Sequence, residues 1–329
     1  MLLEKILLNV KINNMIKVVN PSVEVWKQEG YTLDNIWKHI AKCARVCYQS
    51  VPKDNGEDDY SFLVRTLFRG VEPKDINTKD LVKYHLSVCE HATVHLKYRL
   101  FITKDINQAI RFNDNHYSRT KEHDGYVYVT TNMRVLIEHH WMDELEFIDA
   151  TPNCPYYIPR PTICFITDIG ASRELNRHRV NSISEESTRY CVCDKGKFGN
   201  GITVAKLPWI PEVDPNEEGH DYNEGFFNDN EVFDNNVIEE QYTDNWNAID
   251  WFFYGLQICD LVYRKTRELG WTAQQAREIL PLNTKTQVVH TAFVDDWEHW
   301  IKLRSNKVSG KVHPCMKELA DKLVKLINK

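Results

Sequence analysis

The segment 177–190, RHRVNSISEESTRY, is the feature that most restricts what this chain can form. It holds three arginines, one histidine, two glutamates and four serine or threonine hydroxyls, but only two aliphatic side chains. We therefore expect a binding surface and not a part of the core. Each guanidinium can hold a phosphate or carboxylate through two parallel charge-assisted hydrogen bonds, and neighbouring cations repel one another until an anion binds. The segment predicts an anion site, and a solvated charged loop is the alternative interpretation.

Length and composition are those of an ordinary globular chain. With 329 residues, of which 42% are hydrophobic, it can bury the core of one large domain or two small ones. No apolar run approaches the roughly 20 residues that span a bilayer. The opening residues MLLEKILLNVKINN carry Glu4, Lys5 and Lys11, so we expect neither a membrane anchor nor a signal peptide.

The nine cysteines indicate a reducing, cytoplasmic compartment, because their number is odd and their spacing forms no disulfide framework. Cys191 and Cys193 are separated by one residue, which does not match a redox or zinc motif, so we expect structural thiols and no metal site.

Charge is distributed unevenly along the chain. The net charge is −6, yet residues 211–244 hold twelve acidic residues and no lysine or arginine. We expect that stretch to be a solvated insertion, which leaves the rest of the chain mildly basic. A mildly basic body suits anionic small molecules and is too weakly charged for a nucleic-acid platform.

Apolar periodicity predicts several elements in order. Helices are expected over 33–49, 79–90, 169–176, 247–269, 297–304 and 314–329, and strands over 93–102, 162–168 and 285–294. The strand 93–102 alternates apolar and polar residues and is expected to be half-buried. Residues 104–141 predict two helices around a strand at 126–130. Thr272 and Gln275 form a capping box, and Asp295 with Asp296 is expected to cap the helix that follows. Glycine-rich phosphate loops are absent.

The arginine segment resembles a known family motif. Arg177-His178-Arg179 followed after seven residues by Ser187, and then by Arg189-Tyr190, is similar to the RHR-x7-S signature of the flavin-dependent thymidylate synthases. Other segments resemble the same family over roughly 41–320. They are ARVC at 44–47 (A-R-V-S), HLSVCEH at 85–91 (H-x-[ST]-x-x-E-H), AREILPLN at 276–283 (A-R-x-x-L-P-L-N) and Leu303-Arg304 (L-R).

The resemblance implies a fold, an assembly and an activity. The fold would be α+β, an antiparallel sheet flanked by helices in a single domain over 1–329, with insertions near 104–160 and 205–245. The reaction would be reductive methylation of dUMP to dTMP, a step of dTTP biosynthesis. Methylenetetrahydrofolate would supply the carbon, and FAD reduced by NADPH the electrons. The assembly would be a cytoplasmic homotetramer with shared active sites, without nucleic-acid or membrane partners.

The resemblance also implies site residues. Arg304 matches the residue that faces the uracil, where its positive charge would favour the ionised N3 by lowering the pKa of that group. It is our candidate catalytic residue. Residues matching dUMP-binding positions are Glu174, Arg177, Glu185, Ser187, Thr188, Arg189, Arg277 and Arg304. Residues matching FAD-binding positions are His85, Ser87, Glu90, Arg177, His178, Arg179, Glu185 and His299.

Departures from the family pattern leave other interpretations open. Glu174 stands where relatives often have glutamine. Phe293 and Asp295 stand where many have asparagine and arginine, so a relative without turnover is one alternative. A classical thymidylate synthase needs a P-C-H motif, but Pro314-Cys315 is followed by methionine. A nucleotide-binding or nucleic-acid-binding protein without catalysis is the third alternative.

Overall fold

The structure is a computed structural model that describes residues 16–51, 56–191, 201–210, 247–305 and 311–327. The acidic stretch 211–244 and the opening residues 1–15 lie outside the described residues. The chain divides into two compact units. The first consists of residues 1–21, 167–171 and 187–286, and the second of residues 22–166, 172–186 and 287–329. Within the described residues, every helix is too short or too polar to traverse a lipid bilayer.

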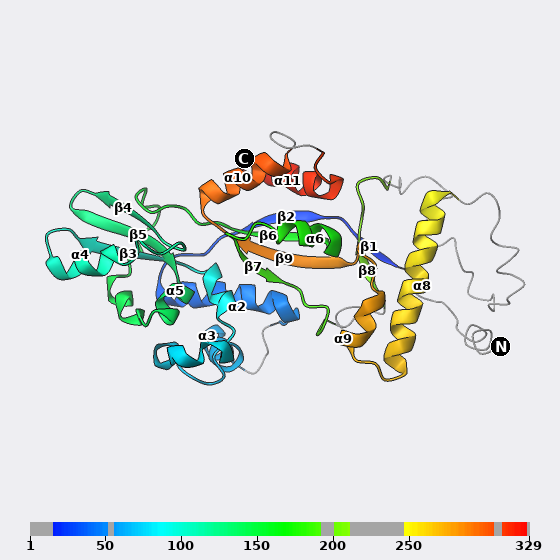
Figure 1. The fold of residues 1–329 in the computed structure, drawn as a ribbon, viewed down its shortest axis with the longest axis horizontal. Helices are drawn as coiled ribbons and strands as arrows, with labels where there is room; N and C mark the ends of the chain where they lie inside the picture. Colours follow the sequence, from blue (N-terminus) through cyan, green and yellow to red (C-terminus); the bar gives the residue numbers. More distant parts are fainter. Residues whose placement is uncertain (1–15, 52–55, 192–200, 211–246, 306–310, 328–329) are drawn as a thin grey trace, which may run out of the picture. The chain divides into compact units, whose positions relative to one another are not determined.

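A four-stranded sheet forms the centre of the second unit. Its order is β2 (Ser22–Trp26), β6 (Thr162–Asp168), β9 (Lys285–Thr291) and β7 (Ser182–Glu185). The pairs β2/β6 and β7/β9 are antiparallel. Helix α2 (Leu33–Tyr48) lies on one face of this sheet, and α10 (Val294–Arg304) and α11 (Pro314–Ile327) lie on the other (Figure 1).

The alternation of side chains on β6 explains this layering. Phe165 is fully buried and packs against Trp297 and Trp300 of α10. Its neighbour Cys164 points to the opposite face and joins the core cluster that contains Cys43 of α2. Successive side chains of a strand point to opposite faces, so an apolar strand such as β6 is buried from both sides. Together with the antiparallel pairings, this confirms the expected α+β class.

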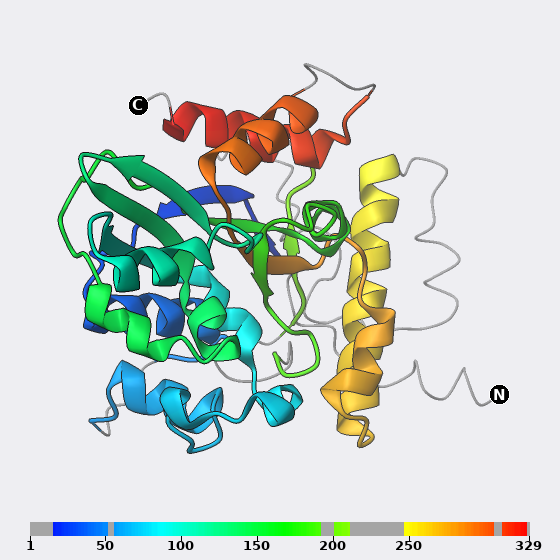
Figure 2. The same cartoon turned by 60° about the vertical axis from the view of Figure 1, so that its left-hand side comes forward.

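A three-stranded antiparallel sheet, in the order β3 (Thr93–Arg99), β5 (Tyr126–Asn132), β4 (Arg119–His123), belongs to the same unit. It is accompanied by α4 (Thr103–Ile110) and α5 (Met133–Glu138), as Figure 2 shows, and the 3-10 turn η4 (Met142–Phe147) contacts β3. The helices α3 (Asp59–Thr66) and η1 (Pro73–Asp75) complete this part. The predicted strand at 126–130 and its flanking helices are confirmed, whereas β4 was not anticipated.

The expectation that β3 is half-buried is wrong, because its polar side is covered as well. The ring of His95 lies between Tyr31 and Tyr157, with ring centroids 3.7 and 3.9 Å away. His95 is only 5% exposed, and burial lowers its pKa to about 3. Neither ring nitrogen has a hydrogen-bond partner among the described residues. The tyrosines therefore hold a neutral imidazole in an apolar stack.

This stack predicts that acid destabilises the protein. His95 is neutral when folded and binds a proton near pH 6.5 when unfolded, so its stabilising contribution is complete above pH 6.5 and is lost as the pH falls toward 3. Over that range one such histidine contributes a slope of about 1.4 kcal/mol per pH unit. In urea unfolding at pH 7, 6 and 5, we expect His95→Phe to reduce the measured slope by about half this amount between pH 7 and 6 and by nearly all of it between pH 6 and 5. The exposed control His116→Gln should leave it unchanged.

A chain of buried polar side chains crosses the four-stranded sheet. His39 Nε2 lies 2.9 Å from Thr162 Oγ1, which lies 2.8 Å from Thr291 Oγ1. His91 Nδ1 lies 2.8 Å from the same Thr291 oxygen, and its Nε2 lies 3.0 Å from Ser184 Oγ. All five residues are at most 5% exposed. Thr291 is the junction of this chain, because its hydroxyl contacts both the Thr162 hydroxyl and His91 Nδ1.

We expect Thr291→Val to destabilise the protein by about 1–3 kcal/mol, because the variant leaves buried polar partners unsatisfied. The matched control is Thr167→Val on β6. Thr167 is 1% exposed, and its hydroxyl bonds to none of the described residues, so its loss should cost far less. Urea unfolding of both variants makes the comparison, and equal losses of stability would contradict the assignment of Thr291 as a junction.

The first unit is built around one long helix. Strand β1 (Lys17–Val19) pairs in parallel with β8 (Thr203–Ala205). The core contains Phe253, Leu256 and Tyr263 of α8 (Ala248–Glu268). The helix α9 (Ala273–Ala276) follows, as Figure 1 shows, and the turn η6 (Arg277–Ile279) comes directly after it in the chain. The predicted capping box of Thr272 and Gln275 is present, which confirms the start of α9.

Two expectations about helices are wrong. Residues 79–90 do not form one helix but two 3-10 turns, η2 (Thr78–Lys83) and η3 (Leu86–His91). The helix is interrupted because the backbone N–H of His85 bonds to the carbonyl of Leu67. Helix α10 begins at Val294, so Asp295 and Asp296 lie inside its first turn and not at its cap. There they still complement the helix dipole.

Candidate functional site

The arginine motif follows a short helix. Strand β6 leads into α6 (Ile169–Leu175), whose start is held by Asp168 Oδ1 accepting a hydrogen bond from the N–H of Ala171 at 2.7 Å. The chain turns after Leu175, and the exposed side chains of Arg177 and Arg179 bond to none of the described residues. A pair of exposed guanidinium groups without counter-ions in the described chain is suited to an anionic ligand.

The middle of the motif is less exposed than expected. Ser182 and Ser184 lie on β7 and are 2% and 4% exposed, so the expectation that the whole segment is surface is wrong there. Small hydroxyl side chains can be buried when they find partners. Ser182 accepts a hydrogen bond from Arg160, and Ser184 bonds to His91.

Three predicted residues meet in the second unit. Arg304, the last residue of α10, donates from Nη1 to Glu174 Oε2 at 2.8 Å and from Nη2 to the backbone oxygen of Glu174 at 3.1 Å. Its Nε donates to His178 Nε2 at 3.2 Å. Burial, and then the charges of Arg304 and His299, lower the pKa of His178 to about 4. The imidazole is therefore neutral at physiological pH, and its Nε2 can accept.

A fourth predicted residue, Glu185, lies close to this group in sequence but has its own partner. Its carboxylate accepts a hydrogen bond from Asn176 Nδ2 at 2.9 Å, so the turn after α6 is tied to β7. Sequence reasoning did not identify Asn176, and no spacing pattern marks it.

The first unit holds the other four residues predicted for the nucleotide, namely Ser187, Thr188, Arg189 and Arg277. Arg277 Nη1 lies 3.5 Å from Thr188 Oγ1, and Arg189 Nε donates to Gln274 at 3.0 Å. The N–H of Arg189 also bonds to Ser187 Oγ at 3.3 Å. Arg189 is thus tied to α9, whereas Arg277 contacts Thr188 and forms an ion pair with Glu278. Gln274 is 85 residues from Arg189, and no sequence signal predicted it.

Residues predicted for the flavin all belong to the second unit. His85 and Ser87 are exposed at η3, and His299 is exposed on α10. Glu90 forms an ion pair with Arg134. Within the described residues, no hydrogen bond or ion pair joins η3 to Arg177 or Arg179. Exposed guanidinium groups such as those of Arg177 and Arg179 are suited to holding phosphates, and no group of metal-binding side chains occurs in the described chain.

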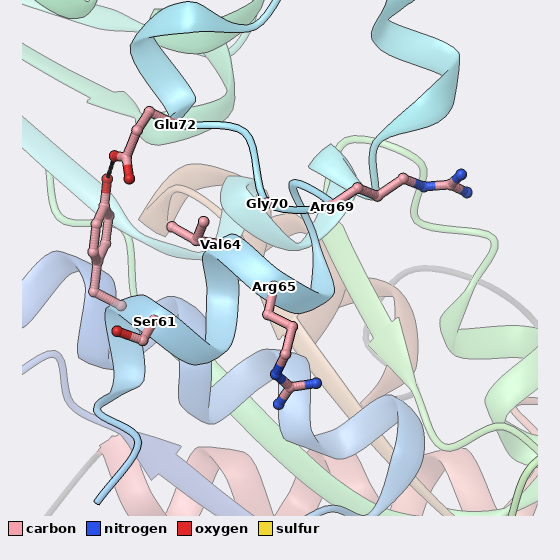
Figure 3. Close-up of a pocket in the computed structure, with 7 residues that line it drawn as sticks. Ser61, Val64, Arg65, Arg69, Gly70 and Glu72 are labelled. Carbon is pink, nitrogen blue, oxygen red and sulfur yellow. Dashed lines mark hydrogen bonds between the residues drawn. The ribbon is translucent and has the colours of Figure 1, made fainter.

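Two open surface depressions lie away from the motif. One of about 500 Å³ lies beside α3, where Figure 3 shows Arg65 and Arg69 extending away from Glu72. Arg65 is paired with Glu57, and Tyr60 with Glu72. Another, of about 520 Å³, lies between α4 and β4. Neither is lined by a residue of the motif. Cys315 is 4% exposed on α11, which does not suit a nucleophile.

Comparison with known proteins gives one family match and several distant structural matches. The sequence profile described as thymidylate synthase complementing protein matches residues 158–329. The UMP/dUMP methylase PolB from Streptomyces cacaoi, bound with 5-Br dUMP, is 15% identical with a TM-score of 0.39. The match covers 95% of this chain and 92% of that one. Thymidylate synthase X from Helicobacter pylori, with FAD and dUMP, is 15% identical with a TM-score of 0.33, covering 93% and 92%.

No curated protein sequence matches the chain. The family profile, however, covers more than half of its residues, including the arginine motif, Arg277 and Arg304. The chain therefore belongs to the thymidylate synthase complementing protein family, the family of the flavin-dependent thymidylate synthases.

Proposed function

We propose that this protein is a FAD-dependent thymidylate synthase that converts dUMP to dTMP, with methylenetetrahydrofolate as carbon donor and NADPH as reductant. The observation that carries the proposal is the contact of Arg304 with Glu174 and His178. Arg304 comes from the end of α10, 130 residues beyond Glu174, and it lies directly against the motif. Family membership supplies the reaction class.

The residues of this chain would bind and polarise the nucleotide. Arg304 presents positive charge to the uracil, which favours the ionised N3 and enriches C5 in electrons. Arg189 and Arg277, aided by Ser187 and Thr188, would hold the phosphate through charge-assisted hydrogen bonds. Glu174, Arg177 and Glu185 would complete the nucleotide set.

The flavin, when bound, supplies the redox chemistry. Arg177 and Arg179 would hold its phosphates, and His85, Ser87, Glu90, His178, Glu185 and His299 would orient it. The neutral state of His178 suits this role, because a neutral imidazole adds no charge beside Arg304. The protein's contribution is thus position and electrostatics, in agreement with a site rich in arginine.

The absorption spectrum of the purified protein, with and without dUMP, is the first test. We expect a yellow protein whose flavin band changes with dUMP and bleaches with NADPH under anaerobic conditions. Chromatography should then detect dTMP when methylenetetrahydrofolate is added. A colourless protein that takes up no added FAD, or a flavoprotein that forms no dTMP, would refute the proposal.

Several further properties belong to the same proposal. They are a homotetramer with shared active sites, a cytoplasmic location, a single catalytic domain over 1–329, and insertions near 104–160 and 205–245. Size-exclusion chromatography with light scattering tests the assembly.

A further inference from the structure

The guanidinium of Arg304 is held by three of its five N–H donors. Among the described residues, its partners are the carboxylate of Glu174, the backbone oxygen of Glu174 and the imidazole of His178. The other two donors have no partner among the described residues and suit a ligand. The side chains of Arg304 and Glu174 are 17% and 27% exposed, so this ion pair is shielded from most of the solvent. A shielded pair is held more rigidly than an exposed one and is less screened by salt.

Only one of these three partners carries a charge. The backbone oxygen and the neutral His178 orient the guanidinium, whereas the Glu174 carboxylate at 2.8 Å also offsets its positive charge. A counter-charge at this distance weakens the attraction of Arg304 for any second anion, because opposite charges partly cancel in the field that a ligand meets. A glutamine at position 174 could keep the hydrogen bond but would not offset the charge.

We infer that Glu174 is a positioning and specificity-determining residue that acts through Arg304. It fixes the guanidinium and moderates its charge, so that the preference of the site for an ionised N3 over a protonated one is weaker than Arg304 without a counter-charge would give. This inference rests on the proposed function, because it takes the uracil of dUMP as the ligand of Arg304.

The test compares two nucleotides on the FAD-loaded, full-length protein. 5-Fluoro-dUMP has a more acidic N3 than dUMP, because fluorine withdraws electrons from the ring. Dissociation constants for both are measured by calorimetry at pH 8 for the wild type and for Glu174→Gln. We expect Glu174→Gln to shift the preference toward 5-fluoro-dUMP by about tenfold, equivalent to one pKa unit of differential interaction.

Two further variants separate charge from position. Glu174→Asp keeps the charge but shortens the side chain, so it should retain the wild-type preference while lowering kcat more than it raises KM. Glu298→Gln removes an exposed carboxylate on α10 that is paired with Lys302. It should change neither the nucleotide preference nor the kinetic constants kcat and KM.

The outcomes distinguish the two proposals. An unchanged nucleotide preference in Glu174→Gln, with dUMP still bound, overturns the role of Glu174 and leaves the thymidylate synthase proposal intact. If Glu174→Gln does not fold, an altered preference in Glu174→Asp overturns the inference, and a retained preference with lowered kcat supports it. Wild-type protein that binds FAD but not dUMP overturns both.

Discussion

Replacing Arg304 with alanine is expected to lower the rate of thymidylate formation by about 10²–10³-fold, the loss typical when a group that stabilises developing negative charge is removed. The structure gives a second reason for a large loss. Without Arg304, the Glu174 carboxylate loses its ion-pair partner and remains in a site that is largely shielded from solvent. It would then face the charge that develops on the uracil. Single-turnover dTMP formation with saturating dUMP measures the effect.

Two companion variants define what that result means. Arg304→Lys keeps the charge, but a single ammonium cannot reproduce the planar fork that bonds Glu174 Oε2, the Glu174 backbone oxygen and His178, so most of the loss should persist. Lys302→Ala removes a nearby exposed cation of the same helix and should leave the rate unchanged. Near-normal turnover in Arg304→Ala would exclude Arg304 as the catalytic residue.

Replacing Trp300 with alanine is expected to destabilise the protein by about 3–5 kcal/mol, the range for truncating a large buried aromatic side chain. Trp300 is fully buried, and its ring centroid lies 5.8 Å from those of Phe165 and Trp297. It therefore joins α10 to the central sheet. The ring centroids of Trp300 and His178 are 6.1 Å apart, so we expect Trp300→Ala also to weaken the hydrogen bond between Arg304 and His178. Urea unfolding followed by circular dichroism measures the stability.

An exposed aromatic residue of the same unit provides the control for Trp300. Phe101 is 75% exposed, and Phe101→Ala should change the free energy of unfolding by less than about 0.5 kcal/mol. Trp300→Phe should lower the free energy of unfolding less than Trp300→Ala but more than Phe101→Ala, because it keeps an aromatic ring in the cluster. A loss below about 1 kcal/mol in Trp300→Ala would show that the aromatic cluster does not hold α10 in place.

Local sequence signals predicted the elements that depend on local physics. The helix α2, the strand β6 and the helix α8 follow apolar periodicity, and α9 follows its capping box. The segment 79–90 has a helix-like pattern as well, yet the His85 N–H bonds to Leu67, a contact that no local pattern encodes. In the same way, the alternation of β3 predicted a solvated face that Tyr157 covers from 62 residues away.

In the candidate site, too, sequence motifs predicted some residues, whereas contacts between distant residues were not predicted. Motif spacing identified Glu174, His178 and Arg304, and the structure places these three side chains in contact. Their roles stay predictions. Spacing did not reveal Gln274 beside Arg189 or Asn176 beside Glu185, because a polar residue that supports another carries no signature of its own. Nor did it show that Glu174 is the charged partner of Arg304, since that depends on side-chain geometry.

Cys43, a buried cysteine of α2, makes the core of the second unit suitable for chemical labelling. Cys43 is fully buried, and burial raises its pKa far above the usual range for a thiol. An alkylating reagent needs both access and a thiolate, so Cys43 should react only in molecules whose core has opened. Mass spectrometry of timed labelling would therefore report how often this core opens under native conditions, before and after a nucleotide is added.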